Sequence, residues 1–237
     1  RSSTIKKLSA SISLINATGM FYNCAQFQGI GLSEWNTVII QNMNKMFYGC
    51  ESLIADLSSW DVSGVGSGNS NGTMEYMFFN TLINFDFTNW DFSNVKSIVG
   101  MFLNCSSLGI NGVDNNLKKL LDPNAIGHVD FNVITNLYRL FEGALYFNED
   151  LSAWDTSNVT NLSNLFLNAA FFNNGGDIGK QLNPMDWDVS NVTNFAATFY
   201  NATSFNQSLA NWDVSSGTYF SRMFMIYRAP TVATTST

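Results

Sequence analysis

The chain has 237 residues, of which 46% are hydrophobic and only 12% are charged, about half the usual ~25%. Its net charge of −7 and its lack of a basic stripe argue against a nucleic-acid partner bound through phosphates. No apolar run approaches the ~20 residues of a membrane span, so we expect no membrane insertion in this segment. The sequence opens at Arg1 with no recognisable signal peptide, which we interpret as a mature or excised piece.

Aromatic residues recur along the chain at a fixed spacing. A Trp is followed twelve residues later by a Phe in the pairs Trp35/Phe47, Trp90/Phe102, Trp154/Phe166, Trp187/Phe199 and Trp212/Phe224. Val129 takes the Trp position before Phe141, and an insert at 64–73 separates Trp60 from Phe78. The basic period of about 25 residues predicts a repeat protein. Its eight units end near Phe21, Phe47, Phe78, Phe102, Phe141, Phe166, Phe199 and Phe224.

These units predict a single repeat solenoid over residues 1–229, followed by a Thr-rich tail or linker at 230–237. Two longer segments interrupt the period. Residues 109–128 carry an insertion that contains a short helix-like stretch at 115–122, and residues 173–181 form a Gly-rich loop. A solenoid tolerates insertions of different length on its outer side.

Within each unit, the pattern predicts a strand followed by a helix. The two-residue step from Trp60 to Val62 is typical of a short strand with one face inward. The apolar spacing of three at Val95, Ile98 and Met101 indicates a short helix that packs one face inward.

A helix stop is predicted two residues after the repeated Phe, because seven of the eight units have Gly or Asn there. We therefore expect an α/β repeat solenoid of about eight turns, each with a short parallel strand and a short helix. The predicted structural core consists of Trp35, Trp60, Trp90, Trp154, Trp187, Trp212, Phe47, Phe102, Phe141, Phe166 and Phe199.

The units resemble the BspA-like leucine-rich repeat family, whose units read close to F-N-x-x-L-S-x-W-D-V-S-N-V-T-N-M-x-x-M-F. Residues 147–166 (FNEDLSAWDTSNVTNLSNLF) and 205–216 (FNQSLANWDVSS) carry this resemblance. It implies a right-handed solenoid on cell-surface or secreted proteins, used for adhesion or assembly and without enzyme activity. The missing first Trp, Val129 and the weak last unit depart from the pattern.

An acidic residue follows the Trp position in most units. Such a row could bind cations or sugar hydroxyls, but Asp at this place is more typical of a turn in which it accepts hydrogen bonds from nearby N–H and Ser hydroxyl groups. The Asn residues four positions after the Trp, Asn94, Asn158 and Asn191, predict an amide ladder. The acidic row consists of Asp61, Asp91, Asp130, Asp155, Asp188 and Asp213.

Glycosylation and a disulfide are further candidates. Asn71 lies in the polar insert and is the best acceptor for an N-linked glycan. Cys24 and Cys50 stand at the same place in neighbouring units, so a disulfide between them is sterically conceivable, whereas the Ala residues found at this place elsewhere favour a small buried side chain. The candidate N-glycosylation sites are Asn71, Asn16, Asn104, Asn201 and Asn206.

His128 is the only histidine and lies in no nucleophile motif, so we expect no catalytic site, cofactor or metal centre. The ends lack evident polar caps. We therefore expect a non-catalytic extracellular or cell-surface module that self-associates or packs against a neighbouring surface protein, end to end or side by side, in a larger assembly or fibre. The alternative is an adhesion module whose sheet or loops bind a host protein or glycan.

Overall fold

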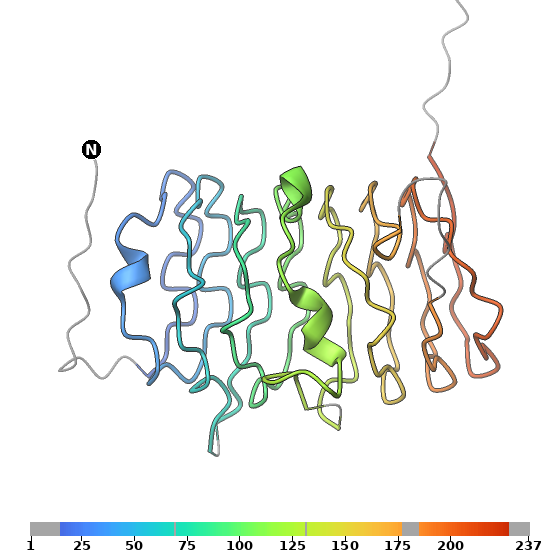
Figure 1. The fold of residues 1–237 in the computed structure, drawn as a ribbon, viewed down its shortest axis with the longest axis horizontal. Coiled ribbons are helices and arrows are strands. Elements are labelled where there is room, and N and C mark those ends of the chain that lie inside the picture. Colours follow the sequence, from blue (N-terminus) through green and yellow to red (C-terminus); the bar gives the residue numbers. More distant parts are fainter. Residues whose placement is uncertain (1–14, 69, 131, 177–184, 228–237) are drawn as a thin grey trace, which may run out of the picture.

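The computed structural model describes residues 15–68, 70–130, 132–176 and 185–227. Successive turns of chain follow one another along one long axis, from the N-terminal turns (blue) to the C-terminal turns (red) (Figure 1). Within the described residues the helices are three short 3-10 helices: η1 (Leu32–Glu34), η2 (Ile110–Gly112) and η3 (Leu117–Leu121). Neighbouring turns are joined by isolated parallel bridges at Asn16–Asn42, Asn136–Asn161, Asn161–Asn194 and Asn194–Tyr219.

The prediction of an α/β solenoid is therefore wrong. The described residues contain no β-strand and no α-helix, and most of them form turns and coil. The segments expected to be helical around Met101 and Phe166 are continuous turns, and those expected to be strands around Trp60 are coil. In the insertion, the stretch 115–122 holds η3, a 3-10 helix.

The turns are linked by a regular backbone ladder. We call the repeated Phe of each unit its reference Phe, and the residues from five before it to two after it the ladder segment. Alternate N–H groups of a ladder segment donate to carbonyls of the next unit, and the N–H groups one before and one after the reference Phe donate three residues back, as in Met46 to Met43. Around Phe47 the bonds to the next unit run from Met43, Lys45, Phe47 and Gly49 to Thr73, Glu75, Met77 and Phe79, at 2.9–3.1 Å.

Left-handed backbone angles explain why this segment is not helical. The position two residues after the reference Phe is left-handed where Asn or Gly stands, as at Asn80 (φ 55°) and Gly49 (φ 70°). The position two residues before it is left-handed in all eight units. An α-helix needs consecutive right-handed residues, so the alternation turns every second N–H towards the next unit. In five units this earlier position holds an ordinary residue: Lys45, Tyr76, Arg139, Ala197 or Arg222.

The interior is filled by two files of aromatic rings. The reference Phe rings form an unbroken file from Phe21 to Phe224, with neighbouring ring centroids 5.4–6.1 Å apart. The Trp rings stack from Trp35 to Trp90 and again from Trp154 to Trp212, at 5.6–6.5 Å. Removing such a ring from water contributes about 1.5–3 kcal/mol, which makes the files a main source of stability.

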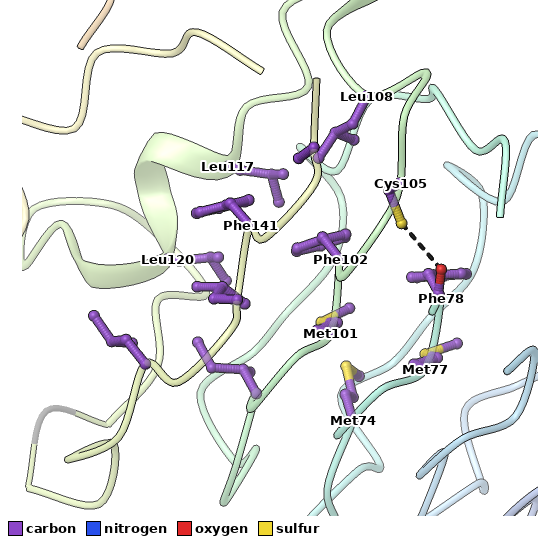
Figure 2. Packing of buried hydrophobic residues seen from close by; sticks show 14 of the residues in the cluster. Met74, Met77, Phe78, Met101, Phe102, Cys105, Leu108, Leu117, Leu120 and Phe141 are labelled. Carbon is purple, nitrogen blue, oxygen red and sulfur yellow. Dashed lines mark hydrogen bonds between the residues drawn. The ribbon is translucent and has the colours of Figure 1, made fainter. Parts of the chain in front are cut away.

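The insertion fills the core at the level of Val129, where the file of Trp rings is interrupted. Three residues of η3, namely Leu117, Leu120 and Leu121, are fully buried. Figure 2 shows Leu117 and Leu120 beside Phe141, with Phe102 in the preceding turn. The insertion is therefore part of the core, because η3 supplies apolar volume where the Trp ring is missing.

Candidate interaction surfaces

The carboxylates of the acidic row hold local turns. Asp61 Oδ1 accepts hydrogen bonds from the Ser63 N–H (3.0 Å) and hydroxyl (2.6 Å), and Asp188 binds Ser190 in the same way. Asp213, whose carboxylate accepts a bond from the Ser215 N–H, has its pKa lowered by bonds from that residue. Each of these carboxylates is thus hydrogen-bonded within its own unit. The same bond to the N–H two residues on is made by Asp91, Asp130 and Asp155.

Two of the three Asn residues predicted to form an internal amide ladder donate to a backbone carbonyl of the preceding unit, but one of them, Asn191, is exposed. Asn94 Nδ2 donates to the Ser63 carbonyl at 3.3 Å, and Asn191 Nδ2 donates to the Ser157 carbonyl at 2.7 Å. Asn158 is exposed.

Most of the candidate glycosylation sites lie on the surface. Asn16, Asn71, Asn104 and Asn206 are exposed. Asn201 is half-buried, and its side chain bonds Asn168 Oδ1 and the Tyr227 N–H. The exposed sites leave room for a glycan, whereas a glycan on Asn201 would be attached at Nδ2, the atom that donates to Asn168 Oδ1.

The three cysteines are free thiols. Cys50 Sγ donates to the Phe21 carbonyl at 3.0 Å, and Cys105 Sγ donates to the Phe78 carbonyl at 3.0 Å (Figure 2). Burial raises the pKa of Cys50 to about 12, so its thiolate, the form that reacts in disulfide exchange, is disfavoured. The structure contains no bond between Cys24 and Cys50, and Cys24 is exposed.

The Trp residues link successive units through their ring nitrogens. Trp60 Nε1 donates to the Leu32 carbonyl at 2.7 Å, and Trp90 Nε1 donates to the Leu57 carbonyl at 2.9 Å. Trp35 Nε1 is buried and has no partner among the described residues, which do not include the preceding half-unit. Trp154, Trp187 and Trp212 make the same kind of bond, to the carbonyls of Lys118, Leu151 and Met185.

A cleft of about 730 Å³ opens between the insertion and Gly175 and Gly176, in the described part of the Gly-rich loop. Tyr146 and Phe171 line it, and their rings stack at 5.1 Å between centroids. Asp114 and Lys118, which form an ion pair at 2.9 Å, and Glu149 also line it. His128 does not line this cleft, and its Nδ1 lies 2.7 Å from the Ala125 carbonyl.

Glu149 ties the insertion to the repeat. One carboxylate oxygen accepts the Asn115 N–H and the other accepts the Lys118 N–H, both at 2.8 Å. Burial raises the pKa of Glu149 to about 7, against the opposing effect of these N–H groups. The carboxylate therefore acts as a titratable clamp between the insertion and the unit that follows Phe141.

Sequence reasoning missed this cleft, although a signal was present. Tyr146 and Phe171 both stand five residues after a reference Phe, where three other units have Ser52, Ser107 and Ser204. Two neighbouring aromatic residues at a polar outer position indicate a local surface feature rather than core.

The last described unit exposes an unusual amount of apolar surface. Its reference Phe, Phe224, is 54% exposed, whereas the reference Phe residues from Phe47 to Phe199 are 0–2% exposed. Such a cluster is typical of an interaction site. Seven large apolar side chains of this unit are 41–65% exposed: Val214, Tyr219, Phe220, Phe224, Met225, Ile226 and Tyr227.

Comparisons with known proteins identify a family but no characterised relative. A family model described as "Mycoplasma protein of unknown function, DUF285" matches residues 15–122 and again residues 110–235. No curated protein and no solved structure matches the chain. No helix in the described ranges is long and apolar enough to span a membrane. Because the two family matches together run from residue 15 to residue 235, the chain belongs to the DUF285 repeat family.

Proposed function

We propose that this chain is a non-catalytic structural module of an extracellular or cell-surface protein, and that it self-associates into a larger assembly through its C-terminal unit. The observation that carries this proposal is the exposed apolar cluster from Val214 to Tyr227. The resemblance of the units to BspA-like repeats supports the surface location and the assembly role.

The chemistry of the chain favours assembly over catalysis. Only 12% of its residues are charged, so a contact between copies removes few charged groups from water. Its acidic row is occupied in local turns, as the bonds of Asp61 and Asp188 illustrate. Burial of exposed rings such as Phe224 supplies a favourable free energy of association.

Sedimentation velocity over a concentration series tests this proposal. The wild-type chain is expected to associate reversibly, and Phe224→Asp to remain monomeric because a buried charge opposes the contact. Phe171→Asp is the matched control, since Phe171 is 45% exposed but lies in the cleft rather than in the last unit. A wild-type chain that stays monomeric at every concentration contradicts the proposal.

Glycan recognition is the second candidate function, and the cleft favours it. Binding sites for small polar molecules combine an apolar wall with a few placed polar groups. Here the stacked rings of Tyr146 and Phe171 form the wall, and Asp114, Lys118 and Asp150 line the same cleft. The rings offer a face for a sugar, and the charged groups offer partners for its hydroxyls.

A glycan array with the wild-type chain tests this second candidate. Binding to a defined glycan that is lost in Phe171→Asp and kept in Phe224→Asp places recognition in the cleft. Phe171→Asp is therefore the test variant in the glycan array and the control in sedimentation, and Phe224→Asp has the opposite roles. An array without any bound glycan removes the candidate.

A further inference from the structure

The C-terminal unit presents a row of unused backbone donors. In internal units such as those of Phe47 and Phe199, the residues four and two before the reference Phe, the Phe itself and the residue two after it supply the N–H groups for the next unit. In the last unit these residues are Phe220, Arg222, Phe224 and Ile226, and none of their N–H groups has an acceptor among the described residues. All four residues are exposed.

The first described unit presents the matching row of acceptors. In internal units, the carbonyls five, three and one before the reference Phe and one after it accept from the preceding unit. In the first unit these belong to Asn16, Thr18, Met20 and Tyr22, which are all exposed. None accepts a backbone hydrogen bond within the described ranges, and Tyr22 is approached only by Cys24 Sγ at 4.0 Å.

From this complementarity we infer that a second copy of this chain docks head to tail, with the C-terminal unit of one copy against the N-terminal unit of the next. The inference rests on the proposed self-association and names the surface that the C-terminal unit contacts. The four donors and four acceptors stand in the register that joins Phe199 to Phe224 and Phe21 to Phe47 inside one chain. The new junction therefore repeats an interface that the fold already contains.

Side chains at the junction fit the same register. Arg222 faces Gly19, which has no side chain, and a Cβ added to Gly19 would meet only Tyr22 Cβ, at 3.7 Å. Phe220 faces the small residue Ala17, and Met225 faces Tyr22. A contact between two different surfaces of one molecule does not close on itself unless a rotation closes a ring, so repeated docking extends the stack along its axis.

Cysteine cross-linking of the full chain tests this geometry. Two proteins are prepared with Cys24→Ala as the common background, one carrying Tyr22→Cys and the other Met225→Cys. Positions 22 and 225 both stand one residue after a reference Phe, on adjacent levels of the predicted junction. The ~4.8 Å spacing of hydrogen-bonded neighbours lies within the Cα separation that a disulfide accepts. A mass tag on one of the two proteins distinguishes mixed dimers, which contain one of each variant, from like dimers of the same variant.

The expected result is that mixed dimers outnumber both kinds of like dimer under mild oxidation. The background protein without either new cysteine is the control, because Cys50 and Cys105 are buried. If Met225→Cys cross-links mainly to itself, the copies meet tail to tail and the inference fails while the assembly function stands. If sedimentation shows no association of the wild-type chain, both fail together.

Discussion

The two sides of each unit are held together by different means. On the side of Phe47 and Phe78, a regular run of backbone N–H and carbonyl groups joins neighbouring units directly, and outward rings such as Tyr48 and Phe79 stack beside it. On the side of Trp60 and Trp90, the junctions depend on side chains: the Trp ring N–H groups and hydroxyls such as that of Thr37, which donates to the Asp61 carbonyl at 2.7 Å. The Phe side is therefore held mainly by backbone groups that every residue carries, whereas the Trp side depends more on residue identity.

The largest effect is expected on the Trp side. Trp90→Ala removes a ring that is 0% exposed and leaves the Leu57 carbonyl without its ring N–H donor. We expect a loss of about 3–5 kcal/mol in the free energy of unfolding, measured by urea denaturation. Trp212→Ala is the matched comparison, and a loss below about 2 kcal/mol is expected because Trp212 is only partly buried. Equal losses for both would contradict the dependence on burial.

The pH dependence of stability is the next largest effect. Unfolded Glu149 releases its proton near pH 4.5, but the folded chain keeps it until about pH 7. The folded state thus binds more protons in this window, and the free energy of unfolding falls as pH rises from about 4.5 to 7, by on the order of 3 kcal/mol.

Urea denaturation across this pH range measures the slope, and Glu149→Gln should remove it whatever its effect on absolute stability. Glu142→Gln is the control. Burial also raises the pKa of Glu142, but Arg139 opposes that rise, so a smaller change is expected. An unchanged slope in Glu149→Gln shows that another group titrates.

A smaller effect is expected on the Phe side at a left-handed glycine. Gly143→Ala forces a side chain into a backbone with φ 68° and against Asn104 Oδ1, so we expect a loss of about 2 kcal/mol. Gly112→Ala has a similar angle (φ 72°) but no atom within 4 Å of the new methyl group, and should lose about 1 kcal/mol. Thermal unfolding of both variants measures the two losses. The difference between them is the part due to crowding against Asn104 rather than to backbone strain.

The smallest effect is a gain in stability. Ala197 has φ 54°, a left-handed angle that costs a residue with a Cβ about 1–2 kcal/mol. Ala197→Gly relieves that cost but increases the entropy of the unfolded chain, so a net gain of up to about 1 kcal/mol is expected in urea denaturation. A loss instead would mean that packing of the Ala methyl outweighs the strain.

The sequence predicts which side chains stack in the core better than it predicts the backbone conformation. Trp and Phe spaced by twelve residues mark the side chains that stack, because burial of large rings leaves a periodic pattern. The predicted strands and helices are wrong because an apolar spacing of three fits a chain of turns as well as a helix. The deciding left-handed position holds Lys45, Tyr76 or Arg139 in some units, residues whose preferences give no sign of it.

The candidate surfaces were less predictable still. The cleft depends on how the insertion folds back onto Glu149, a contact between residues 31–34 positions apart. The resemblance to BspA-like repeats pointed to assembly without naming a surface. The donor and acceptor rows at the two ends become visible only once the alternating ladder is known.

The direction of the ladder gives the whole stack an electrical polarity. Its junction-crossing N–H groups point from the N-terminal towards the C-terminal unit, as those of Phe47 and Phe199 do. Peptide dipoles aligned in this way add along the axis, as they do in an α-helix. Partial positive charge collects at the last unit and partial negative charge at the first, so the molecule should align along its axis in an electric field.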